Sequence, residues 1–166
     1  MSTSPAAGLN AVVITVSDRV AAGEAEDVSG PAVAATLVRH GFKVVAATVV
    51  SDDLEEITFG LREAARTAAL VVTTGGTGIG PRDHTPEATT AVSGRLVPGI
   101  AEAMRRAGSA STQTAILSRG VAAVVGQSLV VNLPGSPAGA VESLEAVAAV
   151  LPHAVAVLSG ADHPRG

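Results

Sequence analysis

The chain has 166 residues, of which 47% are hydrophobic, 16% charged and 1% aromatic. This length is typical of one domain, and a mean hydropathy of +0.42 indicates a packed core rather than a disordered chain. The net charge is −4, and the sequence has no Lys/Arg-rich run, no Tyr and no Trp, which excludes a general nucleic-acid-binding surface. The absence of cysteine excludes disulfides and thiolate metal sites. We therefore expect a single domain over residues 1–166, with an ordered core at about 9–160 and no nucleic-acid partner.

Apolar stretches in this chain are short. Asp, Arg, Gly or Pro interrupts each of them well before the roughly 20 residues that a membrane span needs. Residues 1–9 contain no basic segment leading into a long apolar one, so the sequence predicts no signal peptide. Together with the lack of cysteine, these features favour a cytoplasmic protein with no membrane partner.

Strand and helix patterns alternate along the chain. The first half predicts, in order, a buried strand at 11–16, a helix at 31–40, a buried strand at 44–50, an amphipathic helix at 53–66 and a strand at 70–74. The second half predicts a short helix opening at 85–87, a helix at 98–107, strands at 121–125 and 129–132, a helix from 136 to about 151, and a helical tail at 152–158. Gly30 is expected to cap the helix that starts at Pro31, and Asp53 with Glu56 matches a capping box.

This order of elements predicts an α/β fold. Alternating strands and helices form right-handed crossovers, which build a mostly parallel sheet covered by helices on both faces. The two last strands are joined at Gly126-Gln127, which indicates a small antiparallel hairpin. We therefore expect a three-layer sandwich with a mostly parallel sheet.

Four polar or glycine-rich segments follow the predicted strands. They are residues 17–19, 51–53, 75–83 and 133–136. Parallel α/β sheets bind ligands outside the carboxyl ends of their strands. We therefore expect the four segments to converge at one edge of the sheet and to form an active site there.

The segment from Thr73 to Asp83 is the most informative one. Its glycines let the backbone turn sharply and point N–H groups at an anion, and it also carries Arg82 and leads into a helix that opens at Thr85. It contains neither the glycine spacing of a dinucleotide fingerprint nor the Gly-Lys-Ser/Thr of a Walker A loop. The alternative to an anion site is an ordinary flexible loop.

Asp52 and Asp83 are the candidate catalytic residues. Both lie in loops after predicted strands, and two carboxylates beside a phosphate site suit a Mg²⁺ ion held partly by substrate phosphates. As alternatives, Asp52 would cap a helix, although Asp53 fits that role better, and Asp83 would hydrogen-bond its own loop.

For each of the remaining candidate residues, both a ligand-binding role and a purely structural role are open. Ser17, Asp18 and Arg19 either contact a ligand or close a turn, and Ser118-Arg119 either contacts a ligand or is solvated. Asp27 and Gly30 flank a helix start that either meets a phosphate or is simply capped. The full set of candidate substrate- or nucleotide-binding residues is Ser17, Asp18, Arg19, Asp27, Gly30, Thr74, Gly75, Gly76, Thr77, Gly78, Arg82, Ser118, Arg119, Pro134, Gly135 and Ser136. The four histidines lack metal-ligand spacing, which argues against a zinc site.

From about residue 10 to residue 159 the sequence resembles the MogA/MoaB-type proteins of molybdenum cofactor biosynthesis. The most specific match is the glycine loop followed by Pro81-Arg82-Asp83-His84-Thr85-Pro86-Glu87-Ala88-Thr89. The other matching segments are residues 16–19, 27–30, 52, 97–99, 115–119 and 132–137. Ser51 stands where some relatives have Pro, which leaves Asp52 in register.

The resemblance implies a homotrimer and an adenylyltransferase. The terminal phosphate of molybdopterin would attack the α-phosphate of ATP and release pyrophosphate, with Mg²⁺ as cofactor and a molybdenum-insertion protein as a possible downstream partner. By the match, Asp52 and Asp83 would be the catalytic, metal-associated carboxylates. The pterin and nucleotide pocket would be lined by Ser17, Asp18, Gly75, Gly76, Gly78, Ser118 and Arg119.

Two other functions stay open. Some MoaB-type relatives bind the pterin without transferase activity, so a trimeric, catalytically silent pterin-binding protein is the main alternative. A CinA-like nucleotide pyrophosphatase, in which water is the nucleophile, is the third. The presence of both aspartates favours the enzyme.

Overall fold

Six strands form one sheet in the order β2-β1-β3-β6-β5-β4 in the computed structural model, which describes residues 4–161. Four neighbouring strands are parallel: β2 (Lys43–Val50), β1 (Asn10–Val16), β3 (Leu70–Thr74) and β6 (Ser128–Leu133). The strands β5 (Ala122–Val125) and β4 (Arg95–Leu96) complete the sheet and pair antiparallel. The predicted α/β fold with a mostly parallel sheet and an antiparallel hairpin is therefore confirmed.

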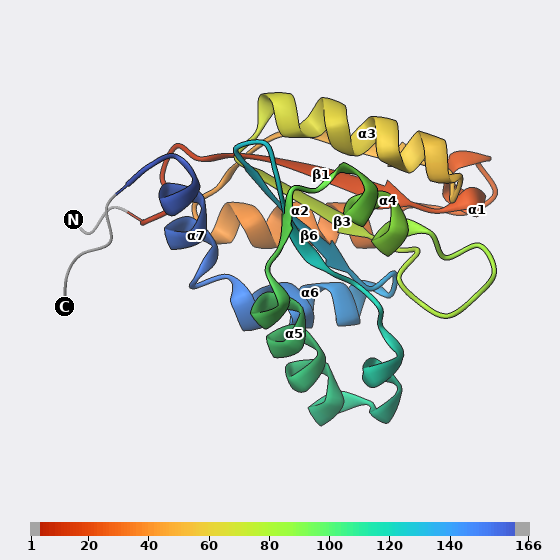
Figure 1. The fold of residues 1–166 in the computed structure, drawn as a ribbon. Coiled ribbons are helices and arrows are strands. Elements are labelled where there is room, and N and C mark those ends of the chain that lie inside the picture. The colour runs from red at the N-terminus through yellow and green to blue at the C-terminus, as the bar shows by residue number, and fades with distance from the viewer. Residues whose placement is uncertain (1–3, 162–166) are drawn as a thin grey trace.

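Helices cover both faces of this sheet. They are α1 (Asp18–Ala21), α2 (Ser29–Arg39), α3 (Leu54–Thr67), α4 (Thr85–Val92), α5 (Pro98–Ser111), α6 (Pro137–Val147) and α7 (Leu151–Leu158), with a short 3₁₀ helix, η1 (Gln113–Leu117), after α5. Figure 1 shows α3 and α4 above the sheet and α2, α5 and α6 below it. Two apolar layers result, because successive residues of a strand point to opposite faces: Val13 packs with the layer of α2 and α6, and Ile14 packs with the layer of α3.

The strand at 43–50 differs from its prediction. Its continuous β-branched run predicts burial on both faces, but β2 lies at the edge of the sheet and most of its residues are exposed, including Val45 and Val49. A run of valines shows that a segment is extended, whereas its place in the sheet order depends on the crossover connections. The prediction of a buried strand was wrong here.

Helix ends also differ from the predicted ones. α2 begins at Ser29, so Gly30 lies inside the helix rather than at its cap, and the carboxylate of Asp27 accepts a hydrogen bond from the Gly30 amide (2.9 Å). The helix predicted from 136 to about 151 ends at Val147, and a 64° bend separates it from α7. Within residues 4–161 no single helix is long and apolar enough to cross a membrane, and only the bent pair α6–α7 taken together reaches that length and composition.

Three short elements were not predicted. They are α1, β4 and η1, each of five residues or fewer, which is too short to show a hydrophobic period. Residues before position 9 also pack against the fold, since Ala6 is fully buried and the Ser4 hydroxyl donates to the His40 carbonyl (3.0 Å).

Candidate active site

The four polar segments that follow the strands meet at one edge of the sheet. The Gly75 amide, after β3, donates to the Leu133 carbonyl at the end of β6 (3.1 Å). The Thr74 hydroxyl donates to the Pro134 carbonyl (2.7 Å). The Asp18 amide, after β1, donates to the Asp52 carboxylate after β2 (2.8 Å). The structure thus brings together the segments that the sequence analysis placed at the carboxyl ends of the strands.

The glycine loop at residues 75–80 has a backbone that only glycine adopts easily. Gly75 and Gly76 have φ values of 102° and 66°, and a Cβ on Gly75 would lie 2.2 Å from the Val16 carbonyl oxygen. Thr85, at the start of α4, fixes the loop from the other side, because its hydroxyl donates to the Gly75 carbonyl (2.9 Å) and its amide to the Gly76 carbonyl (3.1 Å). The loop is therefore held in a defined shape and is not an ordinary flexible connection.

The Arg119 side chain holds this loop through hydrogen bonds to one of its backbone carbonyls and to that of Asp83. Its Nε donates to the Gly78 carbonyl (2.7 Å), its Nη2 donates to the Asp83 carbonyl (2.8 Å), and its Nη1 pairs with the Glu87 carboxylate. The hydrogen bonds from Arg119 also lower the pKa of Glu87. The guanidinium therefore holds the loop in place, and its contact with a ligand stays a prediction.

Asp18 and Asp52 form two reciprocal hydrogen bonds, each from the backbone amide of one residue to the carboxylate of the other. The Asp52 carboxylate accepts from the Asp18 amide (2.8 Å), and the Asp18 carboxylate accepts from the Asp52 amide (3.0 Å). Arg82 grips Asp18 with two nitrogens, Nε at 3.0 Å and Nη2 at 2.9 Å, and these bonds lower the pKa of Asp18. Burial raises the pKa of Asp52, and the nearby carboxylates of Asp18 and Asp83 raise it further. Asp52 therefore lies where negative charge is not fully compensated.

A divalent cation is suited to this uncompensated charge. Asp83 Oδ2 accepts from the Gly80 amide (2.8 Å) and Asp52 Oδ2 from the Asp18 amide, whereas the Oδ1 atoms of Asp52 and Asp83 receive no hydrogen bond from residues 4–161. In that same part of the chain no group of three or more His, Asp or Glu side chains would hold a metal ion alone. Mg²⁺ needs no such group, because it keeps several waters and binds one or two carboxylates together with substrate phosphates. The chemistry of this donor set thus fits a Mg²⁺ ion that is held partly by the phosphates of a ligand.

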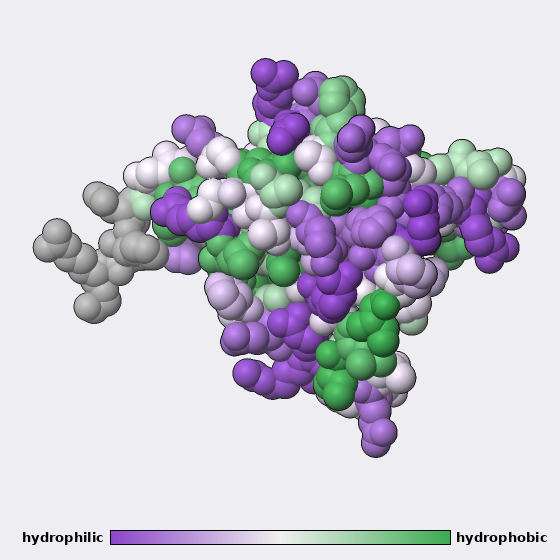
Figure 2. Space-filling model, turned by 45° about the vertical axis from the view of Figure 1, so that its right-hand side comes forward, coloured by the Kyte–Doolittle hydropathy of each residue, from purple (hydrophilic) through white to green (hydrophobic). Residues whose placement is uncertain are grey.

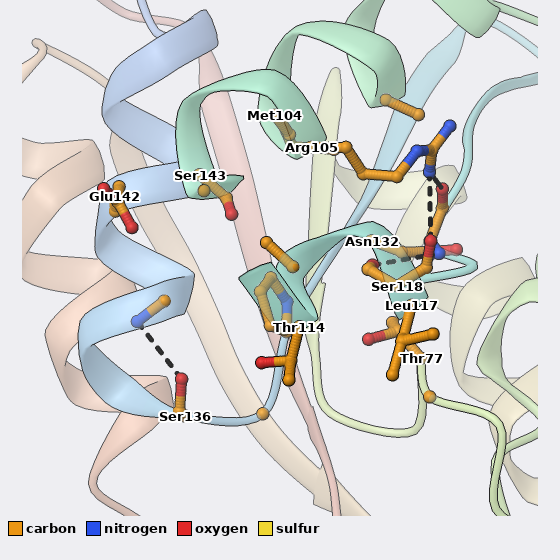
Figure 3. Close-up of a pocket in the computed structure, with 18 of the residues that line it drawn as sticks. Thr77, Met104, Arg105, Thr114, Leu117, Ser118, Asn132, Ser136, Glu142 and Ser143 are labelled. Atoms are coloured by element: carbon orange, nitrogen blue, oxygen red, sulfur yellow. Dashed lines mark hydrogen bonds between the residues drawn. The ribbon is translucent and has the colours of Figure 1, made fainter. Parts of the chain in front are cut away.

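Two cavities flank the glycine loop. The larger, of about 420 Å³, lies between that loop, α5 with η1, and the start of α6. Figure 3 shows Glu142 and Ser143 of α6, with Ser136 at the cap of this helix, on one side of the cavity, and Thr77, Ser118 and Asn132 on the other. The second, of about 400 Å³, lies between the ends of β1 and β3 and the start of α2. Gly76, Asp83 and Gly135 line both cavities, so the two spaces adjoin at the glycine loop.

Most of the predicted site residues line one of these cavities. The larger is lined by Gly76, Thr77, Gly78, Asp83, Ser118, Pro134, Gly135 and Ser136. The second is lined by Ser17, Asp27, Asp52, Thr74, Gly75, Gly76, Asp83 and Gly135.

Five predicted site residues line neither of these two spaces. Asp18 and Arg82 pair with each other, and Arg119 holds the loop. Gly30 is buried inside α2, where a Cβ would lie 2.3 Å from Thr15 Oγ1, and Arg19 is exposed on α1.

The helices supply a wall of the larger cavity that was not predicted from the sequence. It includes Met104 and Arg105 of α5, Leu117 of η1, and Glu142 and Ser143 of α6. Arg105 Nη1 donates to the carbonyls of Ser118 (3.3 Å) and Gly120 (3.0 Å). In a sequence, the side chains of an amphipathic helix are assigned to the core or to solvent, so nothing in the pattern indicated that these residues face a cavity.

The Arg82–Asp18 pair makes stability depend on pH. Because the pKa of Asp18 is lower in the folded than in the unfolded protein, the pair stabilises the fold above the unfolded-state pKa, and this contribution is lost as the pH falls through the folded-state pKa. We expect Arg82→Gln to lower the Tm slightly at pH 7 and to lower it progressively less between pH 5 and pH 2, measured by thermal unfolding. As a control, Arg66→Gln removes an exposed pair with Glu63 and should leave the Tm nearly unchanged. A Tm difference for Arg82→Gln that stays constant down to pH 2 would contradict the assignment.

Together, the fold and the site define an α/β protein that holds a rigid glycine loop and two acidic residues between two adjoining cavities at the carboxyl edge of its sheet. Residues 12–153 match the family model described as "Probable molybdopterin binding domain". The chain therefore belongs to the molybdopterin-binding domain family of molybdenum cofactor biosynthesis, and the resemblance noted in the sequence is confirmed.

Relatives and solved structures agree with this assignment. The chain is 44% identical over 162 residues to a molybdenum cofactor biosynthesis bifunctional protein of Synechococcus elongatus, covering 97% of this chain and 51% of the relative. It is 39% identical to a molybdopterin adenylyltransferase of Helicobacter pylori, covering 89% of this chain and 86% of the relative. The crystal structure of the molybdopterin biosynthesis enzyme MoaB from Thermus thermophilus superposes with a TM-score of 0.87 at 46% identity, covering 92% of this chain and 98% of that one. The chain spans about half the length of the Synechococcus bifunctional relative and of another one, from Chlorobaculum tepidum.

Proposed function

We propose that this protein is a molybdopterin adenylyltransferase, which transfers AMP from ATP to the terminal phosphate of molybdopterin and releases pyrophosphate. The observation that carries the proposal is the pair of adjoining cavities that share Gly76 and Asp83. A transfer between two phosphorylated substrates needs two binding spaces that meet at an anion site, and a binding protein for one ligand needs only one. The name of the Helicobacter relative supports the same reaction.

In this mechanism each cavity takes one substrate. The larger has apolar lining from Met104 and Leu117 and suits the pterin, while the second contains Asp52 and the start of α2 and suits the nucleotide phosphates. The terminal phosphate oxygen of the pterin forms a bond to the α-phosphorus of ATP as the bond to the pyrophosphate oxygen breaks. The rigid glycine loop positions the phosphates for this in-line transfer, and the loop keeps its shape through Arg119 and Thr85.

Asp52 and Asp83 would hold the Mg²⁺ that accompanies ATP, each through the oxygen that no described residue engages. Bound there, the ion would supply positive charge against the phosphates. The protein's own contribution is to fix the two carboxylates, Asp52 through the Asp18 amide and Asp83 through the Gly80 amide.

A catalytically silent molybdopterin-binding protein is the second candidate function. The likeness to structures named MoaB is consistent with it, and the sequence alone left this alternative open. A nucleotide pyrophosphatase, with water as the nucleophile, is a weaker third candidate.

A pyrophosphate-release assay separates the three functions. With ATP and Mg²⁺, we expect the protein to release pyrophosphate only when molybdopterin is supplied, and to release none when EDTA removes the metal. A silent binder would retain the pterin and release no pyrophosphate under either condition. A pyrophosphatase would cleave a dinucleotide with no pterin present.

We also propose that the protein is a homotrimer and that a molybdenum-insertion protein consumes its product. Exposed apolar side chains support association of subunits, among them Val45 and Val49 of β2 and Ile116 and Leu117 of η1. Figure 2 shows a compact apolar cluster toward the bottom of this face, with further apolar side chains scattered among hydrophilic ones above it. Sedimentation velocity would report the number of subunits.

A further inference from the structure

We propose that Glu142 recognises the pyrimidine end of the pterin and so fixes the direction in which the substrate enters the larger cavity. This inference rests on the proposed function, because it takes the pterin to be the occupant of that cavity. It assigns the role to a residue of α6 that belongs neither to the glycine loop nor to the acidic pair.

Charged groups are few in the larger cavity. Among its lining residues only Asp83, Arg105 and Glu142 carry charge. Asp83 lies beside the glycine loop, where the phosphates are expected, because its carboxylate accepts a hydrogen bond from the Gly80 amide. Nη1 of Arg105 is occupied by the carbonyls of Ser118 and Gly120. Glu142 is therefore the one carboxylate that faces this space from outside the proposed phosphate site.

The position of Glu142 is set by its own helix and by α5. Figure 3 shows Glu142 beside Ser143 on α6, on the side of the cavity away from Thr77 of the glycine loop. The hydroxyl of Ser111, at the end of α5, donates to Glu142 Oε1. Its other oxygen, Oε2, accepts no hydrogen bond from residues 4–161 and is available to a ligand.

The chemistry of a carboxylate selects the end of the substrate that it can meet. An ionised carboxylate only accepts hydrogen bonds and repels phosphate, so Glu142 disfavours the anionic end of the molecule. The pyrimidine edge of a pterin presents two neighbouring donors, the exocyclic 2-amino group and the ring N3–H. This edge complements the carboxylate, so the pterin enters with its donors at α6 and its phosphate at the glycine loop.

Direct binding of two simple heterocycles tests this inference without using turnover. Pterin and lumazine differ in that lumazine carries a carbonyl where pterin carries the 2-amino group. Both are fluorescent, and the chain has no Trp or Tyr whose emission would overlap with theirs. We expect the wild-type protein to bind pterin at least about tenfold more tightly than lumazine, since a site built for a donor rejects an analogue that lacks it.

Glu142→Gln should reduce this preference to about threefold or less, because the amide both donates and accepts and no longer discriminates. Ser111→Ala keeps the carboxylate but removes the group that orients it, and should give an intermediate preference. Glu145→Gln is the matched control on the same helix, since Glu145 pairs with Arg39 and His40 and lines neither cavity, and it should leave the preference unchanged. In the pyrophosphate assay Glu142→Gln should raise KM for molybdopterin with little change in kcat.

The inference is overturned if wild-type protein shows no preference for pterin, or if Glu142→Gln keeps the wild-type preference while its thermal unfolding is normal. Failure of the proposed function looks different. In that case molybdopterin-dependent pyrophosphate release is absent, while the pterin preference and its loss in Glu142→Gln are still measured.

Discussion

Asp83→Asn is expected to lower kcat for molybdopterin-dependent pyrophosphate release by about 10³-fold or more, which is the loss typical when a group that acts on the transition state is removed. The carboxamide has the same shape, and its oxygen still accepts from the Gly80 amide, so the glycine loop should keep its conformation. Pterin affinity, measured by fluorescence titration, should stay within about threefold of wild type, because the exchange removes charge and not contact area.

Glu102→Gln provides the control for this variant. Glu102 is exposed on α5 and lines neither of the two cavities that flank the glycine loop, so the exchange removes one negative charge from the molecule without changing the site. It should retain wild-type kcat. An Asp83→Asn protein that keeps more than a tenth of wild-type kcat would refute the catalytic role of this carboxylate.

Gly75→Ala is expected to destabilise the fold by about 2–4 kcal/mol, through backbone strain and a steric clash together. The φ of 102° is outside the range that alanine adopts easily, and the added Cβ would meet the Val16 carbonyl oxygen at 2.2 Å. That oxygen belongs to β1, which pairs with β2 on one side and β3 on the other, so it cannot move away without disturbing the sheet. For a chain of this size the loss corresponds to a decrease in Tm of about 5–15 °C, measured by calorimetry or circular dichroism.

Gly99→Ala is the matched control for backbone effects. Gly99 lies in the first turn of α5, and no heavy atom lies within 4 Å of the position of its added Cβ. The same change should therefore be neutral or stabilise by up to about 1 kcal/mol, because alanine favours helix. Equal destabilisation by the two variants would show that the strain assigned to Gly75 is absent.

Sequence patterns predicted the site best for loops whose place in the fold follows directly from the strand that they come after. Since parallel strands end at one edge of the sheet, placing Asp52, Gly75 and Pro134 after strands was enough to bring their loops together. The same reasoning failed for β2, because a run of valines shows that a strand is apolar but not whether a neighbour covers it.

The partners of individual side chains could not be predicted from the sequence. Arg82 and Arg119 follow the glycine loop and the 3₁₀ helix in positions that suit ligand contact, yet both are engaged by the protein itself, one by Asp18 and the other by Glu87 and two loop carbonyls. These contacts join residues 32 to 64 positions apart in the chain. Glu142 and Arg105 were not predicted as site residues for a related reason: the sequence does not show whether a charged residue on a helix faces a cavity or solvent.

The carboxylate of Asp83 also explains two of the glycines in the neighbouring glycine loop, Gly78 and Gly80. A Cβ at Gly78 and a Cβ at Gly80 would each lie 2.8 Å from the same oxygen, Asp83 Oδ2. Any larger residue at either position would displace the Asp83 carboxylate even when no substrate is bound. The lack of a side chain at Gly78 and Gly80 thus leaves the space that the Asp83 carboxylate occupies. A substitution at either glycine would therefore displace this proposed catalytic group although Asp83 itself is unchanged.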